Sequence, residues 1–77
     1  MPPAPKRFKK ALGERLRTAR NSMGLTTAKV CDKLVINSTY LYDLEAGRQS
    51  PGSYHLYLLC GLYKVSADWV LTGRWKG

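Results

Sequence analysis

Apolar residues recur at intervals of three and four along most of this chain, and residues that begin or end helices divide the pattern into five short segments. The longest stripe consists of Phe8, Leu12, Leu16, Ala19 and Met23. It predicts an amphipathic helix over residues 7–22, which Gly24 can end because glycine accepts a positive φ. No segment alternates apolar and polar residues for more than a few positions, so strands are not expected. The pattern predicts an all-α fold.

Two short helices follow the first with very little chain between them. Thr26 can cap a helix that ends near Leu34, and Asn37 can cap a third helix over residues 38–46. Only residues 35–37 then separate the two. This spacing is typical of a helix-turn-helix, in which the second helix of the pair can enter a major groove, although short helical hairpins are also common in small bundles.

Two further helices complete the pattern. The stretch over residues 47–52 is rich in glycine and polar residues, contains a proline, and reads as a loop. A fourth helix is expected over residues 53–63. A fifth is expected over residues 67–72, where Ser66 can cap its start and Gly73 can end it. The prediction is therefore five short helices.

Length and charge limit the class of protein and of partner. The chain has 77 residues, with 13 Lys and Arg against 5 Asp and Glu, which gives a net charge of +8. This length fits one domain, expected over residues 7–73, between a flexible, basic and proline-rich arm at residues 1–6 and a tail at residues 74–77. The basic balance favours an acidic partner, either nucleic acid or an anionic membrane surface.

The sequence also indicates a compartment. No apolar run approaches the roughly 20 residues that cross a bilayer, and the N-terminus lacks the apolar stretch of a signal peptide. Two cysteines, Cys31 and Cys60, cannot form the disulfide framework of small secreted domains. We expect a cytoplasmic protein with reduced thiols and no membrane partner.

Catalytic and metal-binding patterns are missing from the sequence. His55 is the only histidine and has no carboxylate or cysteine at a telling spacing, so it is expected at the surface. Together with Cys31 and Cys60 it would supply at most three metal ligands, without the usual spacing of a zinc site. The chain has no glycine-rich phosphate loop. We predict neither catalytic residues, nor a metal, nor a cofactor, and expect no enzyme.

Three groups of short motifs follow one another along the chain. They are Gly13-Glu14-Arg15-Leu16-Arg17 with Arg20 and Gly24-Leu25-Thr26, then Leu41-Tyr42-Asp43-Leu44-Glu45-Ala46-Gly47-Arg48 with Pro51, and finally Val65-Ser66-Ala67-Asp68-Trp69-Val70-Leu71-Thr72-Gly73. Each is weak alone, but their order and spacing resemble the lambda-repressor-like (Xre/Cro) family of DNA-binding proteins over residues 11–73. The resemblance implies a compact five-helix bundle in which helices two and three form the helix-turn-helix. It also implies a sequence-specific regulator of transcription that binds double-stranded DNA.

The resemblance places the third helix in the major groove. The residues that would contact bases are Ser38, Thr39, Tyr40, Tyr42 and Asp43. A carboxylate would accept a hydrogen bond from cytosine N4, but Asp43 is equally well explained as a solvated acid that pairs with Arg48. Ser38 and Thr39 are alternatives to Asn37 as the helix cap. The tyrosines could instead cover the edges of a small core.

Phosphate contacts are implied at two places. Thr26 and Thr27 open the second helix, and Arg48 and Ser53 flank the loop after the third helix. The family usually carries a longer amide side chain at the position of Thr27. The basic N-terminal residues Lys6, Arg7, Lys9 and Lys10 are also expected to contact DNA, whereas Arg15 and Arg17 are equally well explained as a solvated helix face.

Two other family positions concern the scaffold. An arginine late in the first helix and a glutamate late in the third are typically paired in this family, and Arg20 and Glu45 stand at the matching positions. The family generally has glycine where this chain has Val35, and a β-branched residue fits a left-handed turn poorly. We expect either another route for the turn or a second helix that is longer by one residue.

A homodimer is expected, because one short helix covers only about half an operator turn. Trp69, Leu71, Trp75 and Tyr57 are the predicted interface residues; Trp69 also suits the core, and the remaining rings of the fourth helix, including Tyr63, could add to the interface. The most specific hypothesis is a small phage- or prophage-type repressor, or a Cro-like protein, that binds a near-palindromic operator and is controlled by its concentration, its dimer equilibrium or an antagonist protein. The alternatives are an antitoxin-type regulator acting mainly through a protein partner, and a basic domain on membrane surfaces, which the short capped helices disfavour.

Overall fold

The computed structural model describes residues 4–74, and this part of the chain is all-helical. Its helices are α1 (Lys6–Ser22), α2 (Thr27–Leu34), α3 (Ser38–Ala46), α4 (Ser53–Tyr63) and α5 (Ala67–Thr72). They confirm the five predicted helices and the predicted fold class. The first helix begins one residue earlier than expected, so Lys6 belongs to α1 and not to the arm. No helix of the described residues is long and apolar enough to cross a membrane.

Local side chains start three of the helices, as the sequence predicted. The Thr26 hydroxyl accepts a hydrogen bond from the Lys29 N–H at 3.1 Å, and the Ser66 hydroxyl accepts one from the Trp69 N–H at 3.1 Å. The Asn37 carboxamide oxygen accepts one from the Thr39 N–H at 2.7 Å. Each of these contacts satisfies an N–H group that the helix itself leaves unpaired.

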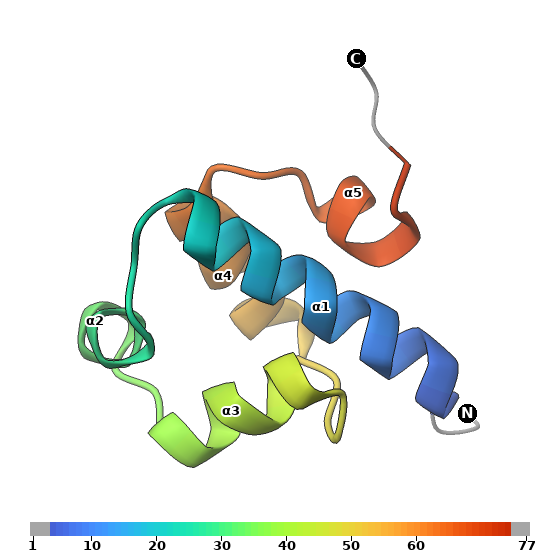
Figure 1. Cartoon of the computed structure of the whole chain (residues 1–77), viewed down its shortest axis with the longest axis horizontal. Coiled ribbons are helices and arrows are strands. Elements are labelled where there is room, and N and C mark those ends of the chain that lie inside the picture. Colours follow the sequence, from blue (N-terminus) through green and yellow to red (C-terminus); the bar gives the residue numbers. More distant parts are fainter. Residues whose placement is uncertain (1–3, 75–77) are drawn as a thin grey trace.

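The core forms around α1, which Figure 1 shows between α3 on one side and α5 on the other. All five helices contribute buried apolar side chains: Leu12, Leu16, Ala19, Val30, Leu41, Leu44, Leu59, Cys60, Tyr63 and Val70. Cys60 behaves as a small apolar residue, while Cys31 is half-buried; both thiols are free. Tyr63 is only 2% exposed, so the suggestion that it could line an interface is wrong.

α1 and α3 cross with their backbones almost in contact. A Cβ atom added to Gly13 would overlap the carbonyl oxygen of Leu44 and would lie 2.7 Å from that of Glu45. Glycine is therefore required at this crossing. Because Leu44 and Glu45 belong to α3, this contact sets how closely the third helix approaches the scaffold.

Both expectations for the turn at Val35 are wrong: the turn takes no other route, and the second helix is not longer by one residue. α2 ends at Leu34, and Val35 itself takes the left-handed conformation, with φ 54° and ψ 51°. The following N–H, of Ile36, donates to the carbonyl of Cys31 at 3.1 Å. The conformation normally supplied by glycine is thus kept, and the β-branched side chain is strained in it.

Candidate nucleic-acid interface

α2 and α3 together present a groove of hydroxyl-bearing side chains. Thr27 from the start of α2 lies opposite Ser38, Thr39 and Tyr42 of α3, and all four residues are exposed. Because Asn37 makes the cap contact, the hydroxyls of Ser38 and Thr39 are not needed to start the helix. The structure therefore leaves short donor–acceptor groups along the exposed edge of α3, a kind of side chain that can meet either donors or acceptors on base edges.

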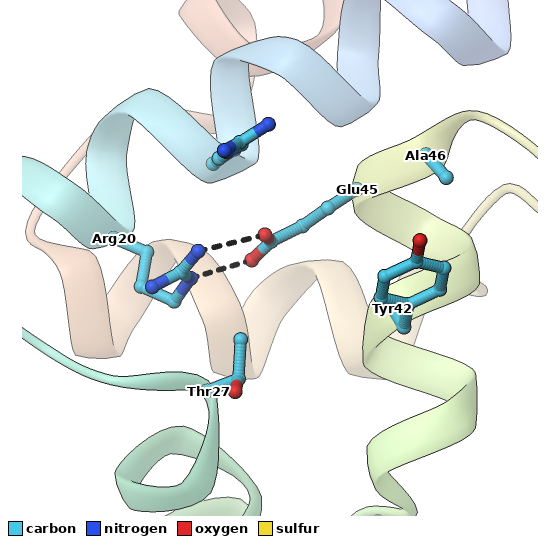
Figure 2. A pocket seen from close by; sticks show the side chains of 6 residues that line it. Arg20, Thr27, Tyr42, Glu45 and Ala46 are labelled. Atoms are coloured by element: carbon cyan, nitrogen blue, oxygen red, sulfur yellow. Dashed lines mark hydrogen bonds and ion pairs between the residues drawn. The ribbon is translucent and has the colours of Figure 1, made fainter.

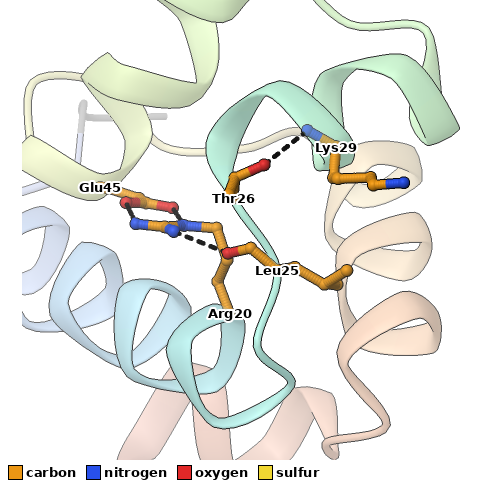
Figure 3. Close-up of polar contacts among 5 residues, drawn as sticks. All are labelled: Arg20, Leu25, Thr26, Lys29 and Glu45. Carbon is orange, nitrogen blue, oxygen red and sulfur yellow. Dashed lines mark hydrogen bonds and ion pairs between the residues drawn. The ribbon is translucent and has the colours of Figure 1, made fainter.

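An ion pair attaches α3 to α1 beside this groove (Figure 3). Arg20 donates from Nε to Glu45 Oε2 at 2.7 Å and from Nη2 to Glu45 Oε1 at 2.9 Å. Its third donor, Nη1, reaches the carbonyl of Leu25 in the segment before α2, at 2.9 Å. The hydrogen bond to Glu45 raises the pKa of Arg20 further. The two side chains, 11% and 9% exposed, thereby connect α1, α3 and the approach to α2.

A pocket of about 430 Å³ lies among α1, α2 and α3, next to the ion pair. Figure 2 shows Thr27 and Tyr42 on opposite sides of it, with Arg20 and Glu45 between α1 and α3. Arg17, an exposed residue of α1, also lines this pocket. A positively charged side chain thus borders the space between the first two helices and α3.

The C-terminal end of α3 carries a polar cluster with the following loop. Asp43 Oδ1 accepts from Arg48 Nη1 and Asp43 Oδ2 accepts from Gln49 Nε2, each at 3.3 Å. The Arg48 guanidinium also lies 5.4 Å from the centroid of the Tyr42 ring. The pairing of Asp43 with Arg48, one of two alternatives drawn from the sequence, is present. Gln49 was not among the predicted residues, although its place one residue after Arg48 was a signal.

Tyr40 is the predicted base contact that lies apart from the others. Its hydroxyl is 2.8 Å from His55 Nδ1 of α4, and the two rings are 5.0 Å apart. Burial raises the pKa of Tyr40. The ring packs against the core, which was the alternative for both tyrosines, whereas Tyr42 is 63% exposed. His55 is half-buried and bonded rather than a free surface residue.

The other predicted phosphate contacts lie on α1, at the start of α2 and at the start of α4. Lys6, Arg7 and Lys10 are exposed on α1, Lys9 is half-buried, and Ser53 is exposed at the start of α4. A Cβ atom on Gly47 would lie 2.7 Å from Lys10 Cα, so the first turns of α1 run beside the loop after α3. Thr26 is exposed but its hydroxyl is engaged as the cap of α2.

Arg15 and Arg17, which the sequence did not distinguish, have different surroundings. Arg15 Nη1 donates to the carbonyl of Val70 at 3.0 Å, so this residue holds α5 against α1. Arg17 lines the pocket beside α3. A signal for Arg17 was available, because it lies three residues before Arg20 and therefore on the same side of the helix.

Those predicted dimer residues that the structure describes lie in different surroundings. Tyr57 is 73% exposed and borders a depression between α2 and α4, while Leu71 is 38% exposed and borders another between α1 and α5. Trp69 packs against the core, and Trp75 lies outside the described residues. Among residues 4–74, no three His, Cys, Asp or Glu side chains are grouped so that they could hold a metal ion.

Comparison with known proteins gives a consistent result. A family model described as a helix-turn-helix domain matches residues 11–70, more than half of the chain. The HTH-type transcriptional regulator ImmR of Bacillus subtilis is 36% identical over 61 residues, which are 79% of this chain and 48% of ImmR. The transcriptional regulator ClgR of Mycobacterium tuberculosis is 33% identical over 63 residues, 82% of this chain and 56% of ClgR. The chain thus spans about half the length of each.

A solved structure agrees with these matches. The clp gene regulator ClgR from C. glutamicum superimposes with a TM-score of 0.75 at 31% identity, over 83% of this chain and 83% of that one. The arrangement of the helices and the sequence therefore point to the same family, the one that the motifs of residues 11–73 resemble.

Proposed function

This chain belongs to the helix-turn-helix family of transcriptional regulators, and we propose that it binds specific sites on double-stranded DNA with α3 in the major groove. One observation carries the proposal. The exposed edge of α3 offers the uncommitted hydroxyls of Ser38 and Thr39 next to Thr27 of α2, while the ion pair of Arg20 and Glu45 holds α3 in place. A rigid helix with free polar groups at its N-terminal end suits the reading of base edges.

The proposal assigns the polar residues to two tasks. Ser38, Thr39, Tyr42 and Asp43 face the bases, and Tyr40 positions α3 against α4 through His55. The residues that contact phosphates and fix the orientation on the duplex are Thr26, Thr27, Arg48, Ser53, Lys6, Arg7, Lys9 and Lys10. The close approach of Lys10 to Gly47 supports this second group, because it brings the basic start of α1 beside the loop after α3.

We further propose a homodimer on a near-palindromic operator, acting as a phage-type repressor in the cytoplasm, without catalysis and controlled by its concentration, its dimer equilibrium or an antagonist protein. A single α3 spans about half an operator turn, so a second copy doubles the contact. The exposed rings and aliphatic side chains of α4 and α5, Tyr57 and Leu71 among them, offer surfaces for the second copy.

The test is fluorescence anisotropy with a duplex selected from a random pool and with a random duplex of equal length, at several salt concentrations. We expect the selected duplex to bind at least about 10³-fold more tightly. If a dimer neutralises about eight phosphates, log K should fall with log salt at a slope of about −7. Equal affinity for both duplexes would contradict sequence-specific binding.

Matched variants tie the binding to α3. Thr39→Ala should weaken the selected duplex by about tenfold, because a hydrogen bond to a base edge is lost, and should hardly change the random duplex. Thr18→Ala is the control, since Thr18 is also exposed but lies on α1. Equal effects of the two substitutions would place the base-reading surface elsewhere.

A further inference from the structure

The carboxylate of Asp43 has both oxygens occupied by side chains of the loop that follows its own helix. Arg48 Nη1 and Gln49 Nε2 each lie 3.3 Å from one of them, and the backbone N–H groups of the same two residues donate to the Asp43 carbonyl at 2.9 and 3.4 Å. The aspartate is largely covered, with 23% of its side chain exposed, whereas the Arg48 side chain is 59% exposed. Asp43 therefore contacts the first residues of the loop through both its carboxylate and its carbonyl oxygen.

Phosphate oxygens accept hydrogen bonds from guanidinium and amide N–H groups such as these two. Arg48 is also one of the residues proposed above to contact a phosphate. A phosphate that draws Arg48 towards the DNA backbone competes with Asp43 for it, because Nη1 of the guanidinium bonds to the carboxylate and the guanidinium lies over the Tyr42 ring. The exchange leaves a carboxylate next to the DNA backbone without its counterion. Like charges brought together in this way weaken binding, unless a new donor reaches the carboxylate.

Only some DNA sequences place a base with a suitable hydrogen-bond donor next to the Asp43 carboxylate. The amino group on cytosine N4 is exposed in the major groove, and aspartate is a suitable acceptor for it. Asp43 lies four residues after Thr39, which lines the groove, and therefore on the same side of α3 as Thr39. On a site with cytosine at this place, Asp43 would exchange Arg48 for the base, and Arg48 would be free for the backbone.

We propose that Asp43 is a positioning residue that makes the phosphate contact of Arg48 conditional on a cytosine beneath α3. In the free protein the carboxylate restrains Arg48 and Gln49. On non-specific DNA the release of Arg48 leaves Asp43 without its counterion, whereas on the specific site the cytosine amino group takes the place of Arg48. This inference rests on the proposed function, and it adds a coupling between one base and one backbone contact.

The experiment is a double-mutant cycle of Asp43→Asn and Arg48→Gln, measured by anisotropy on a random and on a selected duplex at several salt concentrations. Asparagine keeps the shape of the side chain and removes its charge. Asp32→Asn is the matched control, because Asp32 is an exposed acid on α2 and the change in net charge is the same. Thermal unfolding of each variant checks that the fold is kept.

With Arg48 present, we expect Asp43→Asn to bind the random duplex about fivefold more tightly, since Arg48 is released without leaving a bare carboxylate. The steepness of the salt dependence should rise by about one ion. The selected duplex should gain less, and its preference for cytosine at one position should disappear. In the Arg48→Gln background, the same substitution should change random-duplex binding by less than about twofold.

Several results would overturn the inference. An equal gain in both backgrounds, or an equal gain from Asp32→Asn, would mean general charge repulsion and no restraint of Arg48. An unchanged affinity for random DNA would mean that Asp43 does not hold Arg48 back. If the wild-type protein bound all duplexes alike, the proposed function and the dependence on cytosine would both fail. The cycle on random DNA would then still decide whether Asp43 restrains Arg48.

Discussion

Val35 holds a backbone conformation in which valine is strained, and its side chain gains nothing in return because it is 88% exposed. Lys64 provides an internal comparison. It ends α4 with φ 57° and ψ 44°, almost the same conformation, and the next N–H, of Val65, donates to Cys60 as Ile36 does to Cys31. The same turn is thus built twice, once on a β-branched residue and once on an unbranched one.

Val35→Gly should therefore raise the free energy of unfolding by about 1 kcal/mol, which is the relief of left-handed strain less the greater entropy of glycine in the unfolded chain. Lys64→Gly should gain less, because lysine has no branched Cβ. Urea denaturation measures both variants. Equal gains at the two turns would show that the branch at Val35 has no cost.

The Tyr63 hydroxyl is the other residue-scale feature with a measurable consequence. It is buried and has no hydrogen-bond partner among the described residues. Tyr63→Phe should raise the free energy of unfolding by about 1 kcal/mol, because the buried polar atom is removed. Tyr40→Phe makes the same chemical change at a hydroxyl that contacts His55. This substitution should lower the free energy of unfolding by about 1 kcal/mol, because the contact is lost. Two changes of the same sign would contradict this account.

The Tyr63 comparison also depends on pH. Burial raises the pKa of Tyr63 above its ordinary value of 10.0 in an unfolded chain. The fold therefore favours the neutral hydroxyl, and the stability linked to it is complete below about pH 10 and is lost as the pH rises further. Tyr63→Phe lacks this loss, so its advantage over the wild-type protein in urea denaturation should widen above pH 10.

At the scale of elements, the crossing of α1 and α3 decides where the third helix lies. Gly13 lets the two backbones meet, and Arg20 and Glu45 fix the same pair of helices further along. A helix that reads bases must be held by such contacts, because a small shift of its axis moves every side chain on its exposed edge.

Gly13→Ala should lower the free energy of unfolding by at least about 2 kcal/mol, since backbone atoms of α3 must move to admit the new Cβ. Gly61→Ala is the control. Gly61 lies within α4 with no atom near the site of a Cβ, so alanine should stabilise that helix by about 0.5–1 kcal/mol. Urea denaturation gives both values, and a harmless Gly13→Ala would mean that the helices can separate freely.

At the scale of the whole molecule, the positive charge of the surface around α3 depends on where the acidic side chains lie. The chain has only 5 acidic residues, and both of those on α3 are engaged within the protein, Glu45 with Arg20 and Asp43 with Arg48. The side of the molecule formed by α3 and α1 therefore presents Lys10 and Arg17 to an approaching polyanion with little opposing charge.

The sequence by itself determined the helices and their ends, because the signals for these are local. The spacing of apolar residues along α1 and the capping groups of Thr26, Asn37 and Ser66 act within one or two turns. The resemblance to a known family also led directly to Arg20 and Glu45, which the structure joins by two hydrogen bonds.

Only the tertiary structure decided the different contacts of two residues of the same type that lie close together in the sequence. Arg15 reaches α5 while Arg17 faces α3, and Tyr40 packs on α4 while Tyr42 is exposed, because two residues along a helix turn a side chain by more than half a circle. Val35 takes its strained turn between two helices that bury Val30 and Leu41 in the same core. Such outcomes depend on contacts between distant segments, and local patterns in the sequence do not contain them.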